Sequence, residues 1–213
     1  MPLIPEEDAK KLREKFSVME KVVKIKFYRT ANCETCTDMS QLLEELATLA
    51  DQKISIEYHD ISEAPEFLRD GGKGPIMIMG DNNEIIYLGS PLGHEAWAFI
   101  ETIVMLSTGN SQLEDHFKEH LKDLKKNLVV ETIVTPTCPY CPYAVLMANQ
   151  VAIETEGKIV SVPVNAWEFQ DLAVIYNVTA VPVTTIGPEI KKGSVAFVGV
   201  PHLHDFIEKL LAA

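Results

Sequence analysis

The sequence has few basic residues, few cysteines and no long apolar run. Its 19 lysines and arginines are outnumbered by 31 aspartates and glutamates, giving a net charge of -12 at pH 7. Nucleic acids and anionic membrane surfaces attract basic proteins, so this charge argues against both as partners. No stretch of about 18 uninterrupted apolar residues occurs, so we expect no membrane-spanning helix.

The N-terminal segment lacks the features of a targeting signal. Residues 1–15 contain no apolar core, and the acidic side chains of Glu6, Glu7 and Asp8 do not suit a signal or transit peptide. We therefore expect a cytoplasmic protein. All four cysteines fall in two Cys-x-x-Cys motifs, at 33–36 and 138–141, so none remains for a structural bridge. This usage is typical of compartments where structural disulfides are rare and catalytic ones persist.

The second motif, residues 138–141, follows a strand-like run at 128–134 and opens a helix-like run. We expect Cys138 at the helix N-cap and Pro139 at the first helical position, which brings both sulfurs into one turn. The exposed N–H groups of a helix start carry partial positive charge and favour a thiolate. Cys138 is therefore predicted to be the nucleophile, and Cys141 the thiol that resolves the mixed disulfide.

A structural crosslink and a zinc site are the alternatives for these cysteines. A loop of four residues stabilises the fold by only about 2 kcal/mol in the chain-entropy estimate, so the motif is a weak crosslink. Zinc ribbons hold their paired motifs about 15–20 residues apart, whereas Cys36 and Cys138 are about a hundred residues apart. Redox chemistry is the favoured interpretation, with zinc a minor one.

The chain consists of two copies of one pattern. A shift of 105 residues places Cys33 on Cys138 and Thr30 on Thr135. Each copy predicts a helix, a strand, the Cys-x-x-Cys helix, a strand, a short polar helix, a strand pair opened by a proline, and a last helix. The polar stretch 107–111 separates the copies, so we expect two α/β units, 1–108 and 109–213, each a mixed central sheet flanked by helices.

The residue pattern also predicts where the helices and strands begin and end. The helices expected ahead of the first strands cover 10–19 and 113–124, and the short polar helices cover 64–69 and 167–176. The expected strands cover 22–28, 54–59, 76–79, 128–134, 159–164 and 183–186. Because Met77 and Met79 alternate with isoleucines, the strand at 76–79 is predicted to be buried on both faces.

This element order resembles the thioredoxin fold. Two such units in one chain resemble the protein disulfide oxidoreductase family of thermophilic archaea and bacteria, which is glutaredoxin-like and related to protein disulfide isomerase. The resemblance is carried by residues 135–142, 181–182 and 89–94, the last recurring loosely at 199–204. It implies two tandem thioredoxin-like units and a thiol–disulfide oxidoreductase that reduces, oxidises or isomerises disulfides in protein substrates.

The resemblance also implies which residues act. Catalysis is assigned to Cys33 and Cys36 at one centre and to Cys138 and Cys141 at the other. No bound cofactor or metal is implied, and electrons are expected from a flavin- and NADPH-dependent thioredoxin reductase.

In this family a cis proline faces the Cys-x-x-Cys motif, and the backbone just before it pairs with bound peptide. Carried over, this assigns Gly74-Pro75 and Val181-Pro182 to substrate binding. Tyr140, beside the thiols, is expected to belong to an apolar rim that docks unfolded polypeptide.

The sequence departs from the thioredoxin pattern in two respects. Thioredoxins hold a buried aspartate six residues before the first cysteine, where this chain has Phe27 and Thr132. Glu131 and Glu168 are candidate replacements, although a solvated surface carboxylate is the expected role of each. Glu34 lies between the N-terminal cysteines and opposes thiolate formation, so we expect that centre to be the more reducing one.

Other interpretations stay open. His94 and His204 each precede an acid, Glu95 and Asp205, at the start of a last helix. This pattern could indicate Cys/His chemistry, but helix capping and surface polarity are the expected explanation. An alternative function is the electron-passing module of a peroxide-reducing system, which also pairs thioredoxin folds but has normally lost one Cys-x-x-Cys. A metal or iron–sulfur scaffold is the other alternative.

Overall fold

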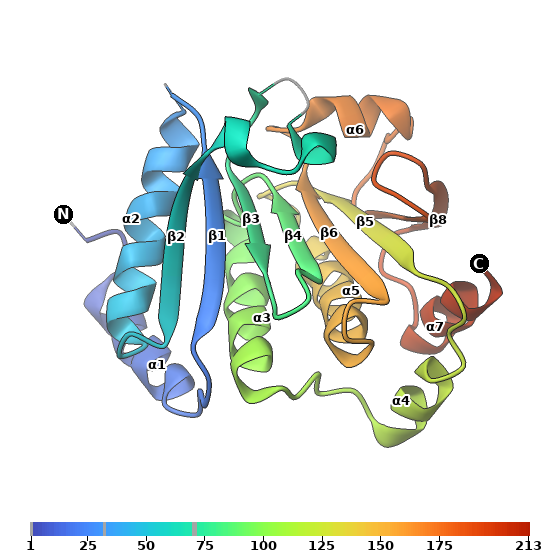
Figure 1. Cartoon of the computed structure of the whole chain (residues 1–213), viewed down its shortest axis with the longest axis horizontal. Helices are drawn as coiled ribbons and strands as arrows, with labels where there is room; N and C mark the ends of the chain where they lie inside the picture. Colours follow the sequence, from blue (N-terminus) through green and yellow to red (C-terminus); the bar gives the residue numbers. More distant parts are fainter. Residues whose placement is uncertain (1, 32, 70–71) are drawn as a thin grey trace.

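The computed structural model describes residues 2–31, 33–69 and 72–213, and their strands form a single sheet (Figure 1). The strand order is β2-β1-β3-β4-β6-β5-β7-β8. The strands are β1 (Val23–Arg29), β2 (Ile54–Asp60), β3 (Ile76–Met79), β4 (Ile85–Leu88), β5 (Leu128–Val134), β6 (Ile159–Asn165), β7 (Val183–Gly187) and β8 (Ser194–Val198).

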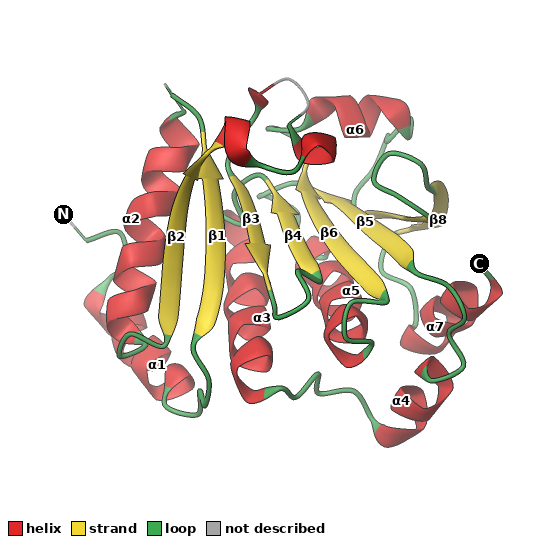
Figure 2. Ribbon diagram, viewed as in Figure 1, coloured by secondary structure: helices red, strands yellow, loops and turns green. Residues whose placement is uncertain are grey.

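Helices flank this sheet, as Figure 2 shows. They are α1 (Glu6–Phe16), α2 (Glu34–Leu49), α3 (Ala96–Thr108), α4 (Asp115–Leu121), α5 (Cys141–Glu154), α6 (Gln170–Ile175) and α7 (Leu203–Ala212), with short 3-10 helices η1 (Ile61–Glu63), η2 (Glu66–Leu68) and η4 (Gly93–Glu95). The predicted α/β class, a mixed central sheet flanked by helices, is confirmed.

The sequence repeat is visible in the sheet. In each half a parallel strand pair is followed by two antiparallel pairs, β2-β1-β3-β4 and β6-β5-β7-β8. The halves join where β4 pairs in parallel with β6, and the Ser161 N–H donates to the Glu84 carbonyl at 2.8 Å. The boundary proposed at 108/109 follows α3 directly, where Gly109 has a φ of 64°.

Alternate residues of the central strands enter different cores. Met77 and Met79 of β3 join the core that α1, α2, α3, α5 and α7 cover. Ile76 and Ile78 join the core on the other face, beneath η1, η2 and α6. The four side chains are all buried, so the prediction of a strand buried on both faces is confirmed.

A buried hydrogen-bond network links α5 and β6 of the C-terminal half to α3 and β4 of the N-terminal half. The Asn149 side chain of α5 donates to the Thr102 hydroxyl of α3 at 2.8 Å and to the Tyr87 hydroxyl at 3.1 Å. Its Oδ1 accepts from the Ser161 hydroxyl at 2.7 Å. These bonds fix the packing of α3 against α5, because a buried amide or hydroxyl without a partner is costly.

Several predicted bounds were wrong. Helix α1 starts at Glu6, earlier than predicted, because its first turn holds the acidic residues that a helix N-terminus favours. The helix predicted at 64–69 is reduced to η2, since Pro65 holds the preceding Ala64 in an extended conformation. Helices α4 and α6 are shorter than the predicted 113–124 and 167–176.

Candidate active sites

Both Cys-x-x-Cys motifs are disulfides at the start of a helix. Cys33 and Cys36 are bonded with their Cα atoms 5.2 Å apart, and Cys138 and Cys141 with theirs 5.5 Å apart. The second cysteine of each pair is the more buried one: Cys36 is 3% exposed while Cys33 is partly exposed, and Cys141 is 0% exposed against 9% for Cys138. The first cysteine is therefore the one that an incoming substrate reaches more readily.

The backbone at each helix start points a donor at the first sulfur. The Cys36 N–H donates to Cys33 Sγ and the Cys141 N–H to Cys138 Sγ, both at 3.1 Å. An amide that donates to sulfur favours the thiolate once the disulfide is reduced. The local geometry thus supports a nucleophilic first cysteine at both centres.

The two motifs start their helices differently. Cys33 is the N-cap of α2, and its carbonyl accepts from the Thr37 N–H at 3.3 Å. The prediction that Cys138 is also an N-cap was wrong, because α5 begins at Cys141 with Tyr140 as its N-cap. A helix capped by Cys138 needs an N–H at residue 142, and Pro142 has none.

The two predicted prolines face the two disulfides. The Gly74-Pro75 and Val181-Pro182 peptide bonds are both cis. The Gly74 carbonyl oxygen lies 3.6 Å from Cys33 Sγ, and the Val181 carbonyl oxygen lies 3.9 Å from Cys138 Sγ. The structure therefore brings each predicted substrate-binding pair to its predicted catalytic pair.

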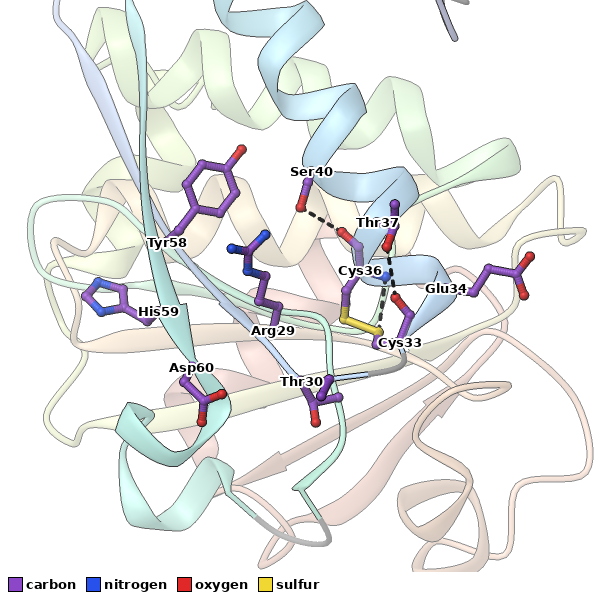
Figure 3. A pocket seen from close by; sticks show the side chains of 11 residues that line it. Arg29, Thr30, Cys33, Glu34, Cys36, Thr37, Ser40, Tyr58, His59 and Asp60 are labelled. Carbon is purple, nitrogen blue, oxygen red and sulfur yellow. Dashed lines mark hydrogen bonds between the residues drawn. A yellow bond between two sulfur atoms is a disulfide. The ribbon is translucent and has the colours of Figure 1, made fainter.

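A groove of about 860 Å³ adjoins the N-terminal disulfide (Figure 3). Cys33 and Cys36 line one side of it, and Arg29, Tyr58 and His59 line the other. The Arg29 guanidinium lies 5.1 Å from the centre of the Tyr58 ring. In Figure 3 the exposed Glu34 side chain points away from the disulfide.

Aromatic side chains surround the C-terminal disulfide. Tyr140, between the two cysteines, is 69% exposed. Tyr143 is also exposed, and its ring packs on the Trp97 ring with centroids 5.3 Å apart. Trp97 belongs to α3, so both halves of the chain contribute to this apolar rim.

Glu131 is not the solvated carboxylate that we expected. It is 1% exposed and accepts from the Tyr176 hydroxyl, the Thr185 hydroxyl and the Lys191 N–H. Burial raises its pKa above the ordinary value, although these bonds act in the opposite direction. These partners lie at the end of α6, on β7 and between β7 and β8, so Glu131 anchors the loops around β7.

Glu95 was also misjudged. It is 2% exposed, makes no helix-capping bond, and neither carboxylate oxygen has a hydrogen-bond partner among the described residues. Burial raises the pKa of Glu95 to about 8. It lies beside the C-terminal site, since the neighbouring His94 N–H donates to the Pro136 carbonyl at 2.9 Å. The sequence offered no signal of this burial, because the same His-acid pattern occurs at His204-Asp205, where Asp205 is largely exposed.

Glu168 is also not the solvated surface carboxylate that we expected. It is partly buried and crosses from the C-terminal half to the N-terminal motif, where the Thr35 hydroxyl donates to Glu168 Oε2 at 3.1 Å. Thr35 lies between the two cysteines of that motif. This contact joins residues 133 positions apart in sequence, which explains why the sequence pattern did not reveal it.

Among residues 2–31, 33–69 and 72–213, none of the helices has the length and hydropathy that a membrane span requires. No three histidine, cysteine, aspartate or glutamate side chains within these ranges are grouped so that they could hold a metal ion.

Comparison with known proteins identifies the class. Residues 128–212 match the family model of the thioredoxin domain. A protein disulfide oxidoreductase from Aeropyrum pernix K1 superposes with a TM-score of 0.85 at 31% identity, covering 97% of this chain and 92% of that one. The alkylhydroperoxide reductase AhpF from Enterococcus faecalis superposes with a TM-score of 0.83 at 25% identity, covering 97% of this chain and 99% of the AhpF chain.

Among curated sequences, an NADH dehydrogenase from Ferdinandcohnia aciditolerans is 23% identical over 158 residues. That match spans 74% of this chain but 29% of the longer protein. The fold and its paired Cys-x-x-Cys disulfides define a tandem thioredoxin-fold protein. The chain belongs to the protein disulfide oxidoreductase family, which confirms the fold class, family and enzyme class predicted from the sequence.

Proposed function

We propose that the protein exchanges thiols and disulfides with protein substrates through two centres, Cys33/Cys36 and Cys138/Cys141. The observation that carries this proposal is the shared geometry of the centres. Each has a disulfide at a helix start, an N–H directed at the first sulfur, and a cis X-Pro carbonyl within 4 Å of that sulfur.

Reduction of a substrate disulfide proceeds in two balanced steps. The Cys138 thiolate attacks one substrate sulfur, forms a mixed disulfide and releases the other substrate sulfur as a thiolate. Cys141 then loses its proton and attacks Cys138 Sγ, which forms the Cys138–Cys141 disulfide and releases the second substrate thiolate. Two electrons pass to the substrate, and oxidation of a substrate dithiol is the reverse.

The surroundings of the C-terminal centre suit an extended polypeptide. The Val181 backbone lies beside Cys138 and supports pairing with a substrate strand, while Tyr140, Tyr143 and Trp97 offer apolar contact without charge specificity. A thioredoxin reductase-like flavoprotein that uses NADPH is the proposed electron donor, and the cytoplasm the proposed location.

Reduction of a disulfide-bonded protein such as insulin tests the proposal. Cys138→Ser should abolish most of the activity, because the nucleophile at the apolar rim is lost, whereas Cys33→Ser should leave a substantial part. Equal loss from the two variants contradicts the asymmetry, and full activity in both refutes the function.

The similarity to the alkylhydroperoxide reductase AhpF favours a second candidate, an electron-passing module that reduces a peroxidase. The retained Cys33/Cys36 centre argues against it, because such modules have normally lost one motif. An oxidised two-cysteine peroxidase offered to the reduced chain, in competition with insulin, separates the candidates. Preferential reduction of the peroxidase would favour the second.

A further inference from the structure

Glu168 lies where the two halves meet, and each of its carboxylate oxygens has its own hydrogen-bond donors. Its Oε1 accepts from the Ser90 N–H at 2.9 Å, from the Ser90 hydroxyl and from Asn165 Nδ2 at 2.7 Å. The orientation of the Asn165 amide is fixed, because its Oδ1 accepts from the Trp167 N–H at 3.0 Å. Oε1 is therefore surrounded by donors, and only Oε2 is left to meet Thr35.

The Thr35 hydroxyl has one proton, and it donates that proton in a hydrogen bond to Glu168. A carboxylate only accepts hydrogen bonds, so the hydroxyl must donate to Oε2, at 3.1 Å. The same oxygen, Thr35 Oγ1, lies 3.5 Å from Cys33 Sγ. Toward the sulfur it therefore presents lone pairs. After reduction of the disulfide, such an oxygen can accept from an S–H group but cannot donate to a thiolate.

We propose that Glu168 is a positioning residue of the N-terminal centre, which acts through the Thr35 hydroxyl to favour the thiol of Cys33 over its thiolate and so makes this disulfide more reducing. The proposal rests on the redox function proposed above. It links a carboxylate of the C-terminal half to the chemistry of the N-terminal half. It also supplies a cause for the expected difference in reduction potential between the centres. Glu34 does not supply that cause, since its side chain points away from the disulfide.

The chemistry of Glu168→Gln makes the idea testable. The glutamine oxygen must occupy the Oε1 position, because the Ser90 N–H and Asn165 Nδ2 there are both donors. Its amide NH2 then faces Thr35 and donates to it, so the hydroxyl turns its proton toward Cys33. The substitution both reverses the hydroxyl and removes a negative charge, and both changes favour the thiolate.

The experiment uses the full chain with Cys138→Ser and Cys141→Ser, so that only the N-terminal centre titrates. Equilibration with glutathione buffers and counting of free thiols gives its reduction potential. Glu168→Gln should increase the equilibrium constant for reduction about tenfold, which corresponds to about 30 mV for a two-electron couple. The rate of Cys33 alkylation near neutral pH should rise several-fold, because the thiolate is the reactive form.

Thr35→Val tests whether the effect passes through the hydroxyl. In that background Glu168→Gln should change the equilibrium constant less than about threefold, since coupled residues are not additive. An undiminished tenfold effect would overturn the route through Thr35. In the chain that keeps Thr35, a change below twofold in the equilibrium constant on Glu168→Gln would overturn the proposal altogether.

Asp171→Asn is the matched control for a simple loss of contact between the halves. Asp171 is also a carboxylate of the C-terminal half, and it pairs with Lys73 of the N-terminal half at 2.6 Å. We expect Asp171→Asn to leave the equilibrium constant for reduction within twofold of the parent's value. An equal shift from both variants would mean that Glu168 acts only by holding the halves together. None of these readouts requires substrate turnover, so they stay informative if the proposed function fails.

Discussion

The Val181 carbonyl oxygen lies 3.9 Å from the sulfur of Cys138. In the N-terminal half the matching carbonyl belongs to Gly74, which has no side chain, and a Cβ there would lie 3.4 Å from Cys36 Sγ. The two centres thus repeat one backbone geometry with different surfaces. An apolar residue and an aromatic rim flank Cys138, whereas an open groove flanks Cys33. We expect the centres to differ in both substrate preference and potential.

The potentials of the two centres should differ, with Cys138/Cys141 the more oxidising. Pro-Tyr between its cysteines matches glutaredoxins, whose potentials are about -200 to -230 mV, against about -270 mV for thioredoxin. We expect a gap of about 30–60 mV, measured by glutathione titration of chains that keep only one centre. An N-terminal centre that is equally or more oxidising would contradict this order.

Tyr140→Ser should weaken binding of protein substrates but not thiol chemistry. Loss of an exposed aromatic contact of about 1–2 kcal/mol should raise KM for a disulfide-bonded protein about 5- to 30-fold. The rate with a small disulfide such as hydroxyethyl disulfide should stay unchanged. Phe67→Ser is the control, since Phe67 is similarly exposed, at 60%, but belongs to η2 in the N-terminal half. An equal effect from both would show that the rim is not specific.

Glu95 should make stability depend on pH. Burial raises the pKa of Glu95 to about 8, so between its ordinary value of 4.5 and about 8 the unfolded chain has lost this proton while the folded chain keeps it. The free energy of unfolding should therefore fall by a few kcal/mol as the pH rises through this window. Denaturant titrations of Glu95→Gln should show a flatter pH dependence.

Part of that dependence should remain in Glu95→Gln, because burial also raises the pKa values of Glu84 and Glu131. The exposed Glu20 serves as the control. Glu20→Gln should reproduce the parental profile, and an unchanged profile in Glu95→Gln would show that Glu95 titrates normally.

The boundary at residues 108/109 stays a proposal, and limited proteolysis tests it. We expect the first cleavage in the exposed loop around Gly109, and separately expressed halves should fold. Each half should be less stable alone, because separation exposes the paired edges of β4 and β6 and breaks the Asn149 network. Two unfolded halves would show that the chain is one cooperative domain.

The repeated local features follow from the amino-acid sequence. The two Cys-x-x-Cys turns and strands β3 and β5 follow from residue type and spacing, because turn chemistry and strand patterning are local. The two cis prolines were expected from the family resemblance. Even the late start of α5 was encoded, since Pro142 lacks the N–H that a cap at Cys138 requires.

Which carboxylates are buried, and what they contact, depends on long-range packing. Glu95, Glu131 and Glu168 are the same residue type, yet Glu95 is buried with no hydrogen-bond partner among the described residues, Glu131 anchors loops around β7, and Glu168 accepts a hydrogen bond from Thr35. The environments of Glu95 and Glu168 arise when β4 pairs with β6 and brings the two halves together, whereas the partners of Glu131 all belong to the C-terminal half. Contacts between residues 133 positions apart depend on that pairing, so no local pattern could encode them.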